Sequence, residues 1–158
     1  MGKINVKIAQ AHENQMRNFD VQREMKSVQN YFDTTELDFN SEAVSLMFLR
    51  GQYNDFAKTM NTALVFVNKM GQKISELHGV IHIHTNTEGI QFAKTTIDFD
   101  EEFMGVLCDN EGLLVHLNIP VRGLEGNRTF TEKELAVVYV CIFPCLLSVF
   151  SLLFSHFY

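Results

Sequence analysis

The chain has too few cysteines to build a disulfide framework. It contains three, Cys108, Cys141 and Cys145, whereas small domains that depend on disulfides carry more of them at regular spacings. The last two lie in a strongly apolar stretch, where cysteine behaves as a small hydrophobic residue. We therefore expect the protein to fold in a reducing compartment such as the cytosol.

Clusters of basic residues are also absent. The chain carries 13 Lys and Arg against 19 Asp and Glu, which gives a formal charge of −6, and no four basic residues stand together. Nucleic-acid phosphates and anionic lipid surfaces are bound through clustered Lys and Arg. The charge pattern therefore argues against nucleic acid as a partner.

Common targeting and catalytic motifs are missing as well. Residues 1–7 contain neither the apolar core nor the cleavage site of a signal peptide. A myristoylation motif at Gly2 requires Ser or Thr at position 6, where Val6 stands. A P-loop, a dinucleotide-binding glycine motif, a nucleophile elbow and a Cys-x-x-Cys motif are all lacking. The sequence thus gives no positive indication of an enzyme.

Charge is lacking throughout the last part of the chain. No Asp, Glu, Lys or Arg occurs from Leu135 to Tyr158, and only His156 can ionise there. About 18 or more apolar residues are needed for a helix to cross a bilayer, and a proline such as Pro144 is tolerated in membrane helices. The pattern predicts a C-terminal membrane anchor over residues 132–158. The alternative is a central buried helix of a soluble domain, which would need packing partners on every side.

Residues just before the apolar segment predict how this anchor starts and is oriented. Thr131 and Glu134 have the spacing of a capping box, which predicts a helix N-terminus. Arg122, Arg128 and Lys133 precede the segment and no basic residue follows it. Because basic residues stay on the cytoplasmic side, we expect a membrane protein whose N-terminal domain faces the cytoplasm.

A stripe of small residues runs along the predicted anchor. Small side chains let helices approach closely in lipid, and serines can hydrogen-bond across the contact. The pattern predicts a homo-oligomer contact, although these residues are also simply tolerated in apolar helices. The stripe consists of Cys141, Cys145, Ser148, Ser151 and Ser155.

Helical periodicity dominates the first half of the chain. Alternation predicts a short strand over residues 4–8, and apolar spacing predicts helices over residues 11–32, 42–50 and 54–77. The last of these has the heptad pattern of a coiled coil. Leu64–Phe66 widen its apolar face, which favours packing on a sheet or bundle over the alternative of a dimer contact.

Four strands are predicted next, and they complete an α+β fold class. Turn residues ending in glycine separate them, which predicts hairpins and a mostly antiparallel four-strand region after the N-terminal strand and helices. We expect a water-facing α+β domain over residues 1–131 and a C-terminal apolar helix over residues 132–158. The predicted strands cover residues 80–85, 89–97, 103–108 and 113–119.

Three histidines form the strongest candidate metal site. Residues two apart in a strand point to the same face, so His82 and His84 should project together, and His116 lies in another predicted strand. Three imidazoles can hold zinc with an open position for water. The alternative, which we favour, is the solvent face of an antiparallel sheet, with no catalytic residue and no cofactor.

Together these patterns predict a tail-anchored membrane protein. Its acidic cytoplasmic domain would bind a protein partner or act as a scaffold at the lipid bilayer, and its anchor would form a homo-oligomer. Two alternatives remain open. One is a hydrolase that uses a histidine-bound metal, and the other is a soluble domain that binds a small ligand and buries the C-terminal helix as its core.

Overall fold

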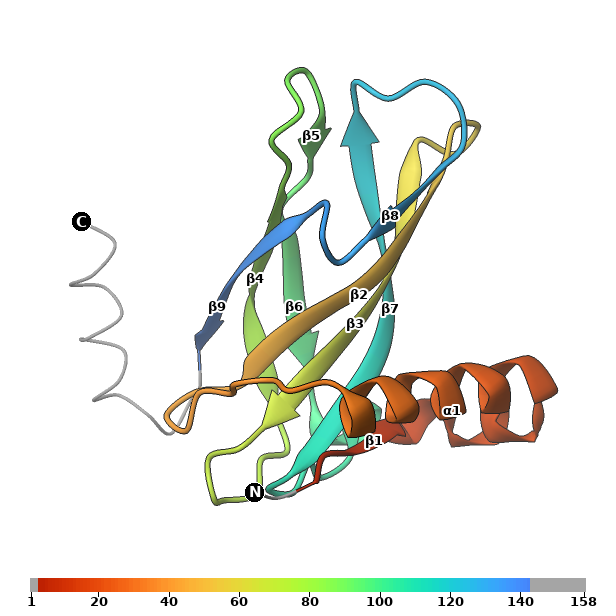
Figure 1. Ribbon diagram of the computed structural model, residues 1–158. Helices are drawn as coiled ribbons and strands as arrows, with labels where there is room; N and C mark the ends of the chain where they lie inside the picture. The colour runs from red at the N-terminus through yellow and green to blue at the C-terminus, as the bar shows by residue number, and fades with distance from the viewer. Residues whose placement is uncertain (1–2, 143–158) are drawn as a thin grey trace.

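Residues 3–142 are described by the structure, a computed structural model, and they form two β-sheets with a helix on the outer face of the larger one (Figure 1). The helices are the 3₁₀ helix η1 (Gln10–Arg17), α1 (Phe19–Thr34) and α2 (Glu101–Met104). The strands are β1 (Asn5–Ile8), β2 (Ser45–Asn54), β3 (Thr59–Asn68), β4 (Leu77–His84), β5 (Gln91–Phe92), β6 (Thr95–Phe99), β7 (Glu111–Arg122), β8 (Arg128–Thr131) and β9 (Ala136–Ile142).

The chain passes between the two sheets more than once. The larger sheet has the order β1-β7-β3-β2-β8, with β5 also paired to β7, and the smaller sheet has the order β6-β4-β9. All pairs are antiparallel except β1 with β7. The chain therefore changes sheets at each connection from β3 to β7 and again between β8 and β9, so neither sheet is made from one continuous segment.

The main core lies between the sheets, and side chains enter it at every second strand position. In β4, Leu77, Ile81 and Ile83 are buried in this core, while the alternate residues, including His82 and His84, lie on the outer face. This is the period-two pattern of a sheet with one solvated face.

Strand β3 is buried on both faces. Leu64 and Phe66 belong to the core between the sheets, whereas Ala63, Val65 and Val67 belong to a second apolar cluster under α1. A strand covered on both faces needs apolar residues at successive positions, and β3 has them. The larger sheet, to which β3 belongs, is therefore the middle layer of the molecule, between α1 and the smaller sheet.

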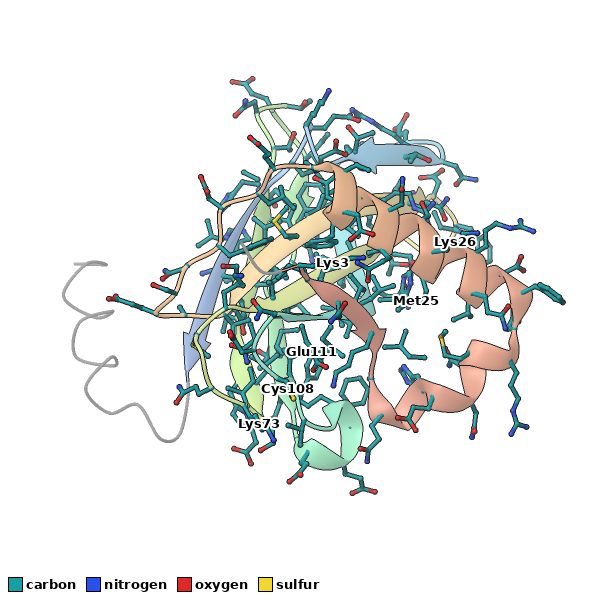
Figure 2. All side chains as sticks on the ribbon, turned by 60° about the horizontal axis from the view of Figure 1, so that its bottom comes forward. Lys3, Met25, Lys26, Lys73, Cys108 and Glu111 are labelled. Carbon is teal, nitrogen blue, oxygen red and sulfur yellow. The ribbon has the colours of Figure 1, made fainter. Side chains whose placement is uncertain are left out.

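Helix α1 packs on the larger sheet through one apolar stripe. The Asn18 side chain caps its N-terminus by accepting a hydrogen bond from the backbone of Asp20 at 2.7 Å. Val28 is the only buried residue of the helix, and Met25 packs in the same cluster while the adjacent Lys26 is exposed (Figure 2). Gln29 adds two hydrogen bonds to β1 and the residue before it, accepting from Val6 N at 2.9 Å and donating to Ile4 O at 2.8 Å.

The predicted α+β arrangement is wrong, because two of its helices are strands. Residues predicted to be helical over 42–50 and 54–77 form most of the β2–β3 hairpin and continue into the start of β4. The heptad pattern arose because β3 is apolar at consecutive positions, and a short apolar run has no period that separates a buried strand from a buried helix. The fold is mostly β.

Other elements agree with the sequence patterns in part. The strand at the N-terminus and the long helix after it are confirmed as β1 and as η1 with α1. The strands predicted over residues 80–85 and 113–119 are confirmed as β4 and β7. The strand predicted over 103–108 is wrong, since residues 101–104 form α2, whose N-terminus is capped by the Asp100 side chain.

The predicted transmembrane helix also needs correction. Ala136–Ile142, expected to start that helix, form β9, which pairs with β4 from His84↔Ala136 to His78↔Ile142. β-branched and aromatic residues such as Val137, Val138 and Tyr139 suit a strand, and Val137 and Tyr139 pack against the main core. Within residues 3–142, none of the helices combines the length and apolar character needed to cross a bilayer. The tail-anchored, transmembrane architecture is therefore not supported.

The predicted oligomer stripe falls almost entirely beyond this region. Cys141 belongs to β9, and the other members of the stripe, Cys145, Ser148, Ser151 and Ser155, lie outside the described residues. Of the two hydrogen bonds of a capping box, one forms: Glu134 Oε1 accepts from Thr131 N at 3.1 Å. Thr131 Oγ1 donates to the same Glu134 oxygen at 3.2 Å, while Glu134 N donates to the Thr131 backbone carbonyl at 3.1 Å. This pair shapes the turn from β8 to β9 rather than a helix start.

Candidate functional site

A cleft of about 610 Å³ lies between α1 and the outer face of the larger sheet. We call it the α1 cleft. One wall is a single side of α1, the floor comes from β2 and β3, and the loop after β8 closes one end. Its lining residues are Asp20, Arg23, Glu24, Ser27, Val28, Tyr31, Leu49, Arg50, Ala63 and Glu132.

A β-bulge in β2 brings two consecutive side chains into this cleft. The pairing of β2 with β3 shifts between Phe48 and Arg50, so Leu49 is the extra residue on the β2 side. A bulge of this kind changes which face a side chain reaches. As a result both Leu49 and Arg50 line the cleft, where a regular strand would have turned one of them toward the main core.

The floor is apolar and the rim is charged. Val28 and Ala63 are buried, with exposed fractions of 8% and 5%, and Leu49 packs in the cluster that they share. Asp20 and Arg23 are exposed on the first turns of α1. An apolar surface bordered by a few polar groups is the usual composition of a binding site.

Glu24 occupies the centre of the charged side of the cleft. Its Oε1 lies 2.6 Å from Nε2 of His116, and its Oε2 accepts a hydrogen bond from Nη2 of Arg50 at 3.5 Å. His116 projects from β7 beside Ala63 of β3, because these two residues are paired across the strands. Residues from α1, β2 and β7 thus fix the position of one carboxylate.

Tyr31 and Glu132 form the far end of the cleft. The pKa of the Tyr31 hydroxyl is raised above its ordinary value, first by partial burial and second by the negative charge of Glu132. The hydroxyl therefore stays protonated at neutral pH and is available as a hydrogen-bond donor. Within residues 3–142, Glu132 itself makes no ion pair.

The three histidines of the predicted metal site are not brought together. His82 and His84 lie on the outer face of the smaller sheet, with their ring centroids 4.0 Å apart. His116 is on the helix-facing side of the larger sheet, so the main core separates it from the other two. In the described part of the chain, no group of three or more His, Cys, Asp or Glu is placed to hold a metal ion.

The residues of the α1 cleft were not identified from the sequence, although one wall left a signal. Asp20, Glu24, Ser27 and Tyr31 are polar and recur at helical spacing within the segment predicted to be helical. The other walls depend on contacts between distant segments and on the bulge at Leu49, which no local pattern indicates.

No protein-family model, curated protein or solved structure matches this chain.

Proposed function

We propose that the protein is a protein-interaction module whose α1 cleft binds a basic side chain of a partner. The observation that carries the proposal is the combination of an apolar floor with carboxylates that exceed the basic groups around it. Asp20, Glu24 and Glu132 line the cleft together with two arginines, Arg23 and Arg50.

The arginines are already engaged by carboxylates. Arg50 bonds to Glu24 at 3.5 Å, and Arg23 lies 4.0 Å from Asp20 on the same helix. Glu132 also lines the cleft, and within residues 3–142 it makes no ion pair. Its carboxylate is therefore available to pair with an incoming cation. A cationic head group is therefore favoured at that end of the cleft.

The floor suits the aliphatic part of the same side chain. Lys and Arg place their methylene chains along apolar surfaces while the charged head stays in polar surroundings. Here Leu49 and Ala63 would contact the methylene chain, and Glu132 and the Tyr31 hydroxyl border the region that receives the head. The net charge of −6 attracts a basic partner over longer distances as well.

The hydrogen-bond partner of His116 favours a binding function over a hydrolytic one. A hydrolytic nucleophile must lie within hydrogen-bond reach of its base. In the described residues, Nε2 of His116 is engaged by Glu24, and neither ring nitrogen bonds to a hydroxyl or thiol. Glu24 and His116 therefore support the wall of a binding site.

Two small probes of opposite charge test the charge preference directly. We expect n-butylguanidinium to shift the backbone NMR signals of Leu49, Arg50, Ala63 and Glu132, while pentanoate, which has a similar apolar chain, leaves them unchanged. Binding of pentanoate at the same residues, or guanidinium shifts confined to another surface, would refute the proposal.

A charge-reversal variant tests the role of Glu132. Glu132→Lys should weaken n-butylguanidinium binding about tenfold, because reversing a charge in a partly exposed pair changes the interaction by roughly 1–2 kcal/mol. Glu125→Lys is the matched control, since Glu125 is exposed and does not line the cleft. A peptide library with a fixed central Arg, Lys or Glu extends the test to protein segments, and enrichment of the Glu peptides would contradict the proposal.

A further inference from the structure

The histidines on the strands differ in what their rings contact. His78 Nδ1 lies 2.6 Å from Asp98, and His116 Nε2 lies 2.6 Å from Glu24, so each has a carboxylate partner. His82 and His84 contact each other instead, with ring centroids 4.0 Å apart and planes inclined by 59°. In the part of the chain that the structure describes, neither of these two rings makes a hydrogen bond or an ion pair.

The His82–His84 pair lies at the end of β4 that pairs with only one neighbouring strand. β4 pairs with β6 only as far as Ile81↔Thr95, so no β6 residue stands beside His82 or His84. On the other side, β9 places Val138 opposite His82 and the small Ala136 opposite His84, and both of these residues are exposed. Solvent and ions can therefore reach the two imidazoles from the outer face of the sheet.

Within the described residues, no carboxylate bonds to either ring of the pair, so neither imidazole is committed to an ion pair. Asp98, the acidic group on β6, is engaged by His78 at the other end of the strand pair. A neutral imidazole carries the lone pair that a metal ion requires.

We propose that His82 and His84 form a two-ligand site for a late first-row divalent ion, with water in the remaining coordination positions. Zinc–nitrogen bonds are about 2.0–2.1 Å long, so two ligand nitrogens of one tetrahedral ion lie about 3.3 Å apart. Rings whose centroids are 4.0 Å apart can present nitrogens at that separation by small rotations of the side chains. This site uses neither His116 nor a third protein ligand.

The ligand type predicts which ions bind. Imidazole suits Zn²⁺, Ni²⁺ and Cu²⁺, and the affinity of such a site increases from Zn²⁺ or Ni²⁺ to Cu²⁺. Magnesium and calcium prefer oxygen ligands and should not bind. The site is thus distinguished from a general attraction of cations to an acidic protein.

Calorimetric titration of the full chain, purified without a histidine tag and in a non-coordinating buffer, tests the proposal. We expect binding of Cu²⁺, Ni²⁺ and Zn²⁺ that His82→Ala or His84→Ala each weakens about tenfold or more, because one imidazole is then left. His78→Ala and His116→Ala are matched controls and should keep the wild-type affinity. Unchanged binding in the His82→Ala/His84→Ala double variant, or an equal loss in the controls, would overturn the proposal.

An NMR measurement on the wild-type protein identifies the ligands without mutation. Substoichiometric Cu²⁺ should broaden the imidazole C–H signals of His82 and His84 before those of His78 and His116. Equal broadening of all the histidines, or no broadening, contradicts the site. Because this experiment uses the unaltered chain, a folding defect in a variant cannot imitate the result.

Discussion

At the scale of single residues, the buried side chain of Asn68 holds a loop in place. Asn68, at the end of β3, is fully buried and donates to the carbonyls of Gln72 at 2.7 Å and Leu107 at 3.0 Å. Its side-chain oxygen accepts from Met70 N at 3.0 Å. One amide therefore ties the loop after β3 to the segment that precedes β7.

We expect Asn68→Ala to lower the free energy of unfolding by about 1–3 kcal/mol, because backbone groups that Asn68 satisfies would lose their partners in a buried place. Urea denaturation measures this change. Asn61→Ala is the control: Asn61 is exposed and bonds only to the Asn118 side chain at 3.0 Å, so its loss should cost under about 1 kcal/mol. Equal effects of the two substitutions would show that the buried network adds no stability.

At the scale of elements, α1 and the sheet beneath it form a layer distinct from the sandwich core. Val28 is the only buried side chain of α1, and the Gln29 bonds to Ile4 and Val6 and the His116–Glu24 contact add polar links. Few contacts hold the helix compared with the strands, so it should open at a lower free energy than the sheets. The α1 cleft depends on this layer staying closed.

Val28→Ala tests that arrangement. Losing two buried methyl groups should destabilise the packing of α1 by about 1–2 kcal/mol. Hydrogen exchange should show the amides of α1 exchanging faster, while those of β3 keep their protection. Lys26→Ala, on the exposed side of the same helix, should leave exchange unchanged. Faster exchange across both sheets in Val28→Ala would mean that α1 and the sandwich unfold as one unit.

Local patterns predicted strands whose sequence alternates apolar and polar residues and failed for strands whose sequence does not. β1 and β4 alternate apolar and polar residues, and this signal identified both. β3 and β9 do not alternate clearly, and each was interpreted as part of a helix. The side-by-side position of His82 and His84 followed from strand periodicity, whereas the distance of His116 from them depends on sheet order, which a single sequence does not reveal.

At the scale of the whole molecule, β9 links the end of the described chain to its middle. Its pairing with β4 completes the smaller sheet, and Tyr139 packs edge-on against Phe66 with ring centroids 5.4 Å apart. The domain boundary predicted after residue 131 therefore falls between β8 of the larger sheet and β9 of the smaller sheet.

Two truncated chains test this dependence on β9. Residues 1–142 should unfold cooperatively in urea, whereas residues 1–131 should lose cooperativity or aggregate, because removal of β9 exposes the edge of β4 and apolar core residues such as Ile81 and Ile83. Circular dichroism and size-exclusion chromatography distinguish these outcomes. If residues 1–131 unfold with the same midpoint as residues 1–142, then β9 does not contribute to the stability of the domain.

The order of the strands also has a consequence for synthesis on the ribosome. β4 lies at the centre of the smaller sheet, yet its partner β9 is among the last described segments to be made. Strand β1 likewise waits for β7, its parallel partner, until most of the chain has emerged. The nascent chain thus keeps strand edges open for much of its translation, and such edges are where chains associate wrongly. Reaching the native fold depends on protecting β4 until β9 leaves the exit tunnel.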